Sequence, residues 1–418
     1  MNDLMAAIKA RAQELTEELT ARRRDFHQHP ELSHQEERTA RVVANYLRDL
    51  GFEVRTGIAG HGVVGILTGA RPGRAVAWRA DMDALPLNEK VKVPWRSQSP
   101  GVMHACGHDF HLAIALGAAR LLSTLKDLLA GQYVFIFQPA EEGPPRESSG
   151  AKGMVEAGVL KDPKVSAIGA LHVAPNLDAG QMRYGLGAVM AGADHLTLTI
   201  TGRSAHGATP HRGVDPILAA ALVLSQIQVF LAQRLDPRSP KILTFGTIQG
   251  GNRFNILADA VRLEGSLRYL QDSVRQEVLT GLRRLFEGLS QATGAEIELN
   301  AGPVYPILRN DPELSRRAVQ ILDTLVGPER LKELKPAMGS EDFSYFAAQV
   351  PAFYFFLGVR PPGSRGQALH SPLFNPDEAA LPWGLTAAAG LLAALSEPAF
   401  PSLAAGSPVA RKGDPGVT

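Results

Sequence analysis

Hydrophobic positions in the first half of the chain follow two alternating patterns, one with helical periodicity and one of short apolar runs. Helical periodicity covers residues 3–28, and Ser33 with Glu36 predicts a capping box for a second helix that ends near Gly51. Four apolar runs of strand type follow, at residues 62–67, 75–80, 133–138 and 167–173. A helical pattern at 111–128 lies among them. This alternation predicts an α/β fold with a largely parallel sheet.

The section from residue 188 to residue 301 has a different rhythm. Its order of strand, helix, two strands, helix and strand is typical of a small α+β domain with helices on one face of an antiparallel sheet. The α/β pattern then returns, with elements expected near 311–326, 353–358 and 377–395. We therefore predict one domain formed by residues 1–187 and 302–400, and an inserted domain at 188–301. Residues 401–418 have little to bury and are expected to form a disordered tail.

Charge and composition exclude several classes of partner. The 43 Lys and Arg residues balance 42 Asp and Glu residues, so no basic surface for nucleic acid is expected. The most apolar run, "ILAAALVL", is shorter than a membrane span, and the charged amphipathic start of the sequence is unlike a signal peptide. A single cysteine cannot form an internal disulfide. We expect a cytoplasmic protein that acts on small molecules, without nucleic-acid or membrane partners.

Polar side chains gather where the predicted strands end. Asp81 and Asp83 follow the run at 75–80, Glu141 and Glu142 follow the run at 133–138, and His172 lies late in the run at 167–173. Each of these alone is most simply a solvated or structural residue. Because ligands of open α/β sheets bind beyond the carboxyl ends of the strands, we expect these groups to converge.

The stretch "MHACGHDFH", residues 103–111, contains the single cysteine of the chain. The spacing of Cys106 and His108 lets a thiolate and an imidazole reach one cation, which favours zinc, and the carboxylates would extend the site to manganese. Two alternatives are a Cys–His nucleophile and a closed structural zinc site. Acidic neighbours oppose thiolate formation without a cation, and adjacent glutamates suit an open catalytic site, in which one carboxylate binds metal and the other handles a proton.

Motifs along nearly the whole chain resemble those of the aminoacylase and carboxypeptidase family of two-metal peptidases, in its amidohydrolase branch. They include "WRADMDALP", "MHACGHDFH", "FQPAEEG", "GRSAHGATPHRGVDP", "GGNRFNILADAVRLEGSLR", "GSEDFSYF" and "LHSPLFNPDEAAL". The resemblance implies an α/β catalytic domain with a largely parallel sheet, formed by residues 1–187 and 302–400. It also implies that the inserted domain at 188–301 is a ferredoxin-like α+β lid through which the chain dimerises.

The same resemblance assigns roles to residues of the catalytic domain. Glu141 falls at the position of the general base, and Asp83 at that of an aspartate that orients a ligand. Asp81 stands where other branches carry a ligand histidine, and His104 and His111 receive no ligand role. Five residues fall at metal-ligand positions: Cys106, His108, Glu142, His172 and His370.

Three residues of the inserted domain match positions that act on the substrate. Asn255 and Arg268 match residues that hold the free carboxylate of the amino-acid half, a task that suits a guanidinium. His206 matches a histidine that reaches the active site of the neighbouring subunit and donates to the oxyanion. The alternatives are a solvated face for Arg268 and simple loop packing for His206.

The activity implied by the resemblance is metal-dependent hydrolysis of the amide bond of N-acyl amino acids, or of small C-terminal peptide-like substrates. A water activated by the metals, with Glu141 as general base, would attack the carbonyl. Two divalent ions per subunit are expected, zinc foremost and manganese or cobalt as alternatives, in a homodimer or a higher oligomer. The competing function is a catalytically silent metal-binding or assembly protein on the same fold. No motif marks the residues that select the acyl group.

Overall fold

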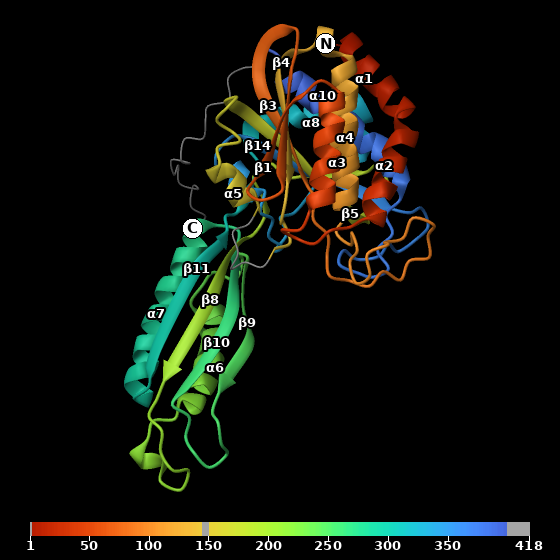
Figure 1. Ribbon diagram of the computed structural model, residues 1–418. Helices are drawn as coiled ribbons and strands as arrows, with labels where there is room; N and C mark the ends of the chain where they lie inside the picture. Colours follow the sequence, from red (N-terminus) through yellow and green to blue (C-terminus); the bar gives the residue numbers. More distant parts are fainter. Residues whose placement is uncertain (1, 144–149, 399–418) are drawn as a thin grey trace. The chain divides into compact units, whose positions relative to one another are not determined.

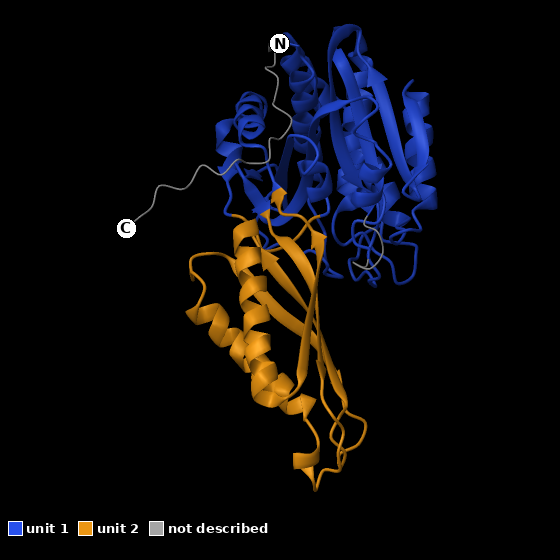
Figure 2. Cartoon of the chain, turned by 90° about the vertical axis from the view of Figure 1, so that its left-hand side faces the viewer, with its two compact units in different colours: residues 1–189, 309–335, 342–418 blue, residues 190–308, 336–341 orange. Residues whose placement is uncertain are grey.

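The computed structural model describes residues 2–143 and 150–398, and the chain divides into two compact units (Figure 2). The first unit extends to residue 189 and includes residues 309–335 and the chain from 342 onward. The second unit comprises residues 190–308 and a short return at 336–341, which the sequence did not predict. The tail expected at 401–418 lies outside the described residues. The functions of catalytic domain and lid that the resemblance implies for the two units remain proposals.

One eight-stranded mixed sheet forms the first unit, in the order β1-β2-β4-β3-β5-β14-β6-β13. Figure 1 labels β1, β3, β4, β5 and β14 of this sheet. Its strands are β1 (Glu53–Ile58), β2 (Gly62–Thr68), β3 (Arg71–Asp81), β4 (Ala130–Gln138), β5 (Val165–Asp178), β6 (Met182–Tyr184), β13 (Leu331–Glu333) and β14 (Ala352–Arg360). Neighbouring strands from β4 through β3 and β5 to β14 are parallel, whereas β1, β2 and β4 pair antiparallel. The predicted α/β fold with a largely parallel sheet is therefore confirmed.

Helices cover this sheet, and the two most apolar of them lie in the hydrophobic core of the first unit. The helices are α1 (Asn2–Glu14), α2 (Thr16–Gln28), α3 (Glu37–Asp49), α4 (His108–Thr124), α5 (Gly150–Glu156), α8 (Pro312–Val326), α9 (Ser344–Ala347) and α10 (Leu381–Leu395). Helices α4 and α10 are almost wholly buried and pack on each other and on β3. The single helix predicted at 3–28 is interrupted at Leu15. This core fixes the first turn of α4, which carries part of the candidate site.

The prediction of a capping box before α3 is wrong, because Ser33 and Glu36 instead bind residues next to the candidate site. The Ser33 hydroxyl donates to Asp83 Oδ2 at 2.6 Å, and Glu36 Oε1 accepts from the amide of Ala140 at 2.8 Å. Neither side chain caps the helix. Glu31 instead accepts hydrogen bonds from two amides of the first turn of α3, at 2.9 and 2.8 Å. Partners distant in sequence therefore replace the local cap that the sequence suggested.

A four-stranded antiparallel sheet with order β11-β8-β10-β9 forms the second unit. Its elements are β8 (Gly192–Thr201), α6 (Pro216–Gln233), β9 (Lys241–Gly250), β10 (Ala260–Tyr269), α7 (Asp272–Thr293) and β11 (Glu296–Tyr305). The short strands β7 (Ala188–Met190) and β12 (Leu308–Arg309) pair separately. Helices α6 and α7 pack on each other and on β10. The βαββαβ order on such a sheet is the ferredoxin-like α+β arrangement that was expected.

Two helical stretches, Pro216–Gln233 and Glu378–Leu395, are long and apolar enough to cross a membrane by length and composition alone. The second is largely buried in the core of the first unit. Helix α6, in contrast, buries only part of its apolar surface. Its exposed apolar residues are Ile217, Leu218, Leu222 and Val229. Helix α6 therefore presents an apolar face that the second unit does not cover.

Candidate metal centre and active site

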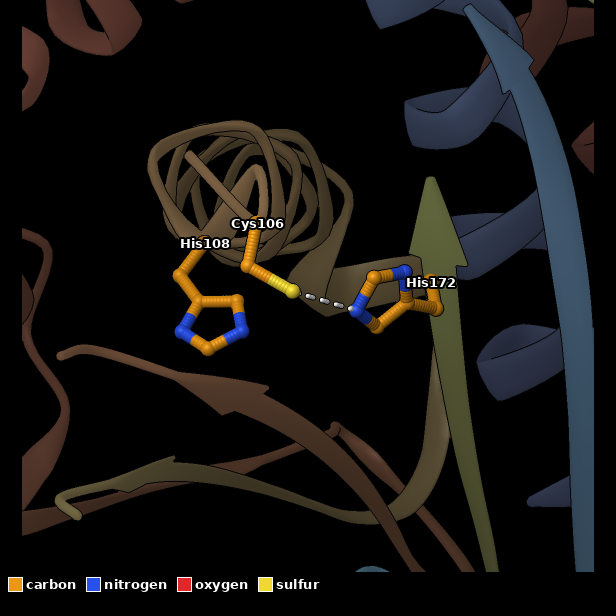
Figure 3. A group of neighbouring side chains, drawn as sticks. All are labelled: Cys106, His108 and His172. Carbon is orange, nitrogen blue, oxygen red and sulfur yellow. Dashed lines mark hydrogen bonds between the residues drawn. The ribbon is translucent and has the colours of Figure 1, made fainter. Parts of the chain in front are cut away.

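The turn that begins α4 brings Cys106 and His108 to one side of the helix end, as Figure 3 shows. Gly107 forms the N-cap with φ +90°, a left-handed conformation that favours glycine. A Cβ atom at this position would lie 2.3 Å from Val173 Cγ2, so no other residue fits without displacement. The spacing recognised in the sequence therefore has a steric cause, because only glycine allows the two ligand candidates to face β5 together.

Both imidazoles near this turn are oriented by backbone carbonyls. His108 donates from Nδ1 to the carbonyl of Asp83 at 2.8 Å, and His172 donates from Nδ1 to the carbonyl of Val173 at 2.8 Å. His172 Nε2 then lies 3.3 Å from Cys106 Sγ (Figure 3). His108 Nε2 is buried without a hydrogen-bond partner among the described residues. Such fixation of one ring nitrogen is the usual arrangement of a histidine whose other nitrogen binds a metal.

Glu141 and Glu142 follow the carboxyl end of β4, and Glu142 meets a histidine from a distant loop. The His370 Nε2 atom lies 3.0 Å from Glu142 Oε1, and the His370 amide donates to the carbonyl of Ala105 at 2.8 Å. His370 has φ +60°, a left-handed value that a residue with a Cβ atom adopts only when its surroundings hold it. This ion pair raises the pKa of His370, despite partial burial.

All five predicted metal ligands lie in overlapping groups whose candidate ligand atoms are within 4.8 Å of one another. One group contains Cys106, His108 and His172. A second contains Cys106, Glu142 and His370, and a third joins His108 to Glu141 and Glu142. Because Cys106 belongs to two groups, the arrangement fits two adjacent cations. The unpartnered, buried Nε2 atom of His108 is an independent sign that the donor set suits a metal.

Negative charge at the cluster also favours cations. Burial lowers the pKa of His108, but the carboxylates of Asp81, Asp83 and Glu142 outweigh burial and raise it to about 10. Carboxylates that stabilise a proton on His108 would stabilise a metal ion in its place. Burial alone would raise the pKa of Asp83, but His108, Ser33 and the amide of Glu142 together lower it. Asp83 therefore stays charged at neutral pH.

A nucleophilic role for Cys106 fits the structure less well than metal binding. Burial, followed by the negative charges of Glu142 and Glu141, raises the pKa of the Cys106 thiol well above its ordinary value. Nucleophilic cysteines require the opposite environment, one that stabilises the thiolate. Without a cation this thiol is protonated and unreactive. The structure therefore favours the metal-ligand interpretation of Cys106.

Asp81, which the resemblance places where other branches carry a ligand histidine, binds to Arg79 and His111. Arg79 Nη1 lies 2.5 Å from Asp81 Oδ2, and His111 Nδ1 donates to Asp81 Oδ1 at 2.5 Å. His111 Nε2 accepts from the amide of Val173, so both nitrogens of His111 are used. Burial raises the pKa of Asp81, but Arg79 and His108 outweigh burial and keep it well below its usual range. The hydrogen bonds of Asp81 and His111 thus support the site, although both residues also lie with His108 in a further group whose candidate ligand atoms are within 4.8 Å of one another.

Among the three histidines of the stretch "MHACGHDFH", His104 is the one whose ring makes no hydrogen bond to the described residues. It is 1% exposed, and neither ring nitrogen has a hydrogen-bond partner among the described residues. Burial lowers its pKa to about 3, so the ring is neutral. No group of candidate metal ligands includes it. The structure therefore gives His104 no direct role at the cluster.

In the second unit, His206 and Asn255 lie together, and Arg268 lies far from them along β10. The amide of Gly207 donates to the carbonyl of Asn255 at 2.9 Å, and His206 forms a β-bridge with Ile256. Asn255 precedes the first residue of β10, whereas Arg268 is near its last. Eight strand residues at about 3.3 Å each separate the two ends by roughly 26 Å.

Two of these side chains are exposed, whereas that of Arg268 is partly buried. His206 and Asn255 are exposed, and Nδ1 of His206 accepts a hydrogen bond from the nearby amide of Ala208 at 3.1 Å. Arg268 donates from Nη1 to the carbonyl of Met338 at 3.1 Å and to Ser340 Oγ at 3.2 Å. A substrate carboxylate could replace those two acceptors.

Sequence reasoning missed part of the support of the cluster. The Arg79 guanidinium also contacts Gln138 and Asp342, at 2.8 Å each, and Gln138 Nε2 donates to Asp342 Oδ2 at 2.7 Å. These residues are buried. The sequence offered two signals, an arginine within the apolar run at 75–80 and Asp342 within the motif "GSEDFSYF", but nothing in it joins two residues that are 263 positions apart.

Comparison with known proteins agrees with this geometry. The chain is 38% identical over 360 residues to thermostable carboxypeptidase 2 of Saccharolobus solfataricus, covering 86% of this chain and 90% of that protein. It is 36% identical over 384 residues to IAA-amino acid hydrolase ILR1-like 2 of Arabidopsis thaliana, covering 90% and 84% respectively.

A solved structure and a family profile complete the comparison. One similar solved structure is that of the YXEP protein of Bacillus subtilis, described as a dinuclear metal binding peptidase from the M20 family. Its superposition on this chain gives a TM-score of 0.80 at 32% sequence identity, and the match covers 92% of this chain and 99% of that one. The profile of peptidase family M20/M25/M40 matches residues 77–394. The chain is therefore a hydrolase of the metal-dependent peptidase and amidohydrolase type, and it belongs to peptidase family M20/M25/M40.

Proposed function

We propose that the protein hydrolyses the amide bond of N-acyl amino acids, or of small C-terminal peptide-like substrates, with Glu141 as general base. The observation that carries the proposal is the position of Glu141 in the same group as the candidate ligands His108 and Glu142. A carboxylate next to two ligands is placed to move a proton between water and substrate.

Five side chains would hold two divalent cations: Cys106, His108, Glu142, His172 and His370. When bound, the cations would make a water molecule acidic and polarise the scissile carbonyl. Glu141 accepts the proton of that water on a carboxylate oxygen and later delivers it to the departing amine nitrogen. Asp83 supports this role because it binds the backbone amide of Glu141 at 3.1 Å.

Arg268, Asn255 and the relatives support this substrate class. Two of the relatives are named carboxypeptidase and IAA-amino acid hydrolase, and these names suit a substrate whose released half is an amino acid. Such a half carries a free carboxylate, for which a guanidinium offers two parallel donors. Arg268 already donates to two neutral oxygens, and a carboxylate would be a stronger acceptor.

We propose that the active form is a homodimer through the second unit. His206 and Asn255 lie toward one end of β10 and Arg268 lies near the other, which supports this proposal, because strand ends roughly 26 Å apart cannot hold one small substrate from the same chain. His206 would then serve the site of the partner. A second copy would also cover the apolar residues of α6 and the edge strand β9, where Ile248 is 59% exposed.

Zinc is the metal that we expect first, with manganese or cobalt as alternatives, because the proposed donors combine one thiolate, three imidazoles and one carboxylate. We also propose a cytoplasmic location. Cys106 is a free thiol in the described structure, and it must stay reduced to bind a cation. The cytoplasm supplies that condition.

A hydrolysis assay tests the proposal. A panel of N-acetyl, N-benzoyl and indolylacetyl amino acids, with small peptides, would be assayed after chelation and after addition of zinc, manganese or cobalt. We expect hydrolysis that chelator removes and one of these ions restores. A fully metal-loaded protein that cleaves none of these amides would support the silent metal-binding alternative.

Substitution of Cys106 separates the metal-ligand role from the nucleophile role. Cys106→Ala should lower bound metal and activity together. A nucleophile would leave the metal content intact, and the native protein would then accumulate an acylated Cys106 detectable by mass spectrometry. Finding that adduct would overturn the metal assignment.

A further inference from the structure

Three consecutive backbone amides hold the turn that carries Glu141 and Glu142. The Ala140 amide donates to Glu36 Oε1 at 2.8 Å, the Glu141 amide to Asp83 Oδ1 at 3.1 Å, and the Glu142 amide to Asp83 Oδ2 at 2.9 Å. Successive amides of a tight turn form a concave surface that binds anions. Here two buried carboxyl groups of the chain bind all three amides.

The first residue of this turn has an unfavourable backbone conformation. Ala140 has φ +51°, in the left-handed region that residues with a Cβ atom rarely adopt. Such a conformation persists only where surrounding contacts hold it. Ala140 is 1% exposed, its amide binds Glu36, and its carbonyl accepts the amide of Gly150 at 3.2 Å. The hydrogen bond from Ala140 to Glu36 therefore lies at the strained residue itself.

The cost of burying Glu36 indicates that the side chain has a purpose beyond stability. Glu36 is fully buried, and its Oε2 atom makes no hydrogen bond of normal geometry within the described residues. Burial and the negative charge of Asp83 raise the pKa of Glu36 to about 7, although the amides of Ala140, Glu36 and His34 favour the charged form. An apolar side chain would avoid the cost of burying a carboxyl group, but it would leave the buried amide of Ala140 without its acceptor.

Capping of α3 does not explain Glu36. The residue occupies the N-cap position, but its side chain makes no capping hydrogen bond, and Glu31 binds the free amides of the first turn. The short hydrogen bond of the Glu36 side chain goes instead to Ala140, 104 positions away. The contact joins the start of α3 to the turn that follows β4.

We propose that Glu36 is a positioning residue for the general base, which fixes Ala140 so that Glu141 keeps its direction toward the cluster. The inference rests on the proposed function of Glu141 and deepens it. Asp83 binds the amides of both glutamates, whereas Glu36 binds only the residue before the base. Loss of Glu36 therefore loosens the turn on the side of Glu141, while Asp83 still holds Glu142 for its cation.

Two substitutions of similar size separate the acceptor from the bulk of the side chain. Glu36→Gln keeps an oxygen acceptor for the Ala140 amide, and Glu36→Met fills similar space without one. We expect Glu36→Met to lower kcat on the order of 10²-fold, the effect of a displacement near 1 Å at a reacting group. KM and bound metal should stay near native, and added zinc should not restore kcat. Glu36→Gln should remain close to native.

The neighbouring Glu37 provides a matched control, because it is exposed in the first turn of α3 and its side chain makes no hydrogen bond to the 140–142 turn. Glu37→Ala should leave kcat unchanged. If Glu36→Met does not fold, Glu36→Ala takes its place in the same comparison. Native kcat in the variant that lacks the acceptor would overturn the proposal, as would a Glu36→Gln variant that is equally impaired.

Amide hydrogen exchange at Ala140, resolved by fragmentation in a mass spectrometer, tests the contact without an activity assay. Exchange should be faster in Glu36→Met and native in Glu36→Gln. Equal exchange in both variants would overturn the contact's role. If the native protein shows no chelator-sensitive hydrolysis, the proposed function fails, and the exchange result still decides whether Glu36 holds the turn.

Discussion

The candidate residues of the first unit and those of the second differ in how far the chain itself fixes their geometry. In the first unit, His108, His172 and Cys106 are buried, and each histidine has one nitrogen bound to a backbone carbonyl. In the second unit, His206 and Asn255 are exposed. The first group is therefore organised before any ligand arrives, which suits chemistry that depends on fixed charges. The second group is completed by substrate and, as we propose, by a partner subunit.

The largest effect should come from the organised group. Glu141→Gln removes a proton acceptor and no proposed metal ligand, so kcat should fall roughly 10²- to 10⁴-fold while bound metal stays near native. Kinetics and metal analysis of the same preparation would measure both. Substantial turnover in this variant would exclude Glu141 as the base.

A somewhat smaller effect is expected from His206, and subunit mixing can locate it. Loss of an oxyanion donor costs on the order of 3 kcal/mol, or about 10²- to 10³-fold in kcat. His206→Ala and Glu141→Gln should each be nearly inactive. If His206 serves the partner, a mixed dimer has one centre with both defects and one with neither, so activity should rise toward half of native per mixed dimer.

The same mixing experiment has a clear opposite outcome. If His206 serves its own chain, each centre of the mixed dimer keeps one defect and no activity returns. A monomer with full activity would also contradict the cross-subunit role. Exchange itself must be verified, for example with two affinity tags on the two variants.

Arg268 should show a still smaller and selective effect. A charged hydrogen bond contributes about 1.5–3 kcal/mol, so Arg268→Ala should lower kcat/KM for N-acyl amino acids roughly 10- to 100-fold. The corresponding amides, which lack the carboxylate, should lose much less. Arg262→Ala on the same strand, where Arg262 pairs with Glu264, is a matched control. If kcat/KM fell equally for the N-acyl amino acids and for their amides, Arg268 would have a structural role and would not bind the substrate carboxylate.

The smallest expected effect is a loss of stability on removal of a helix cap, and it tests whether the two units unfold independently. Asp215 and Asp311 each cap a helix that begins with proline, α6 in the second unit and α8 in the first. Replacing either by Ala should cost about 1 kcal/mol. If the units unfold separately, hydrogen exchange should accelerate only in the helix that lost its cap. If either substitution accelerated hydrogen exchange in both helices, the two units would unfold as one cooperative unit.

The sequence predicted the parts of the molecule that have a local or chemically distinctive signal. The central strands are continuous apolar runs, and the combination of Cys106 with His108 is rare enough to mark a site. Strand β1 was missed because its residues are all at least partly exposed and its glycine breaks the pattern. Ser33 and Glu36 were misread as a local cap, because their true partners Asp83 and Ala140 are 50 and 104 positions away.

If Cys106 binds both of the proposed cations, this one sulfur atom, which is common to two groups of candidate ligands, would link the two cation positions thermodynamically. A thiol must release its proton to bind a metal, so the ion that enters first bears the cost of forming the thiolate. The second ion then finds that ligand ready, and by reciprocity each ion strengthens the binding of the other. Titration with a chelator should accordingly empty the centre in a single cooperative step, and a stable form with one ion should be scarce.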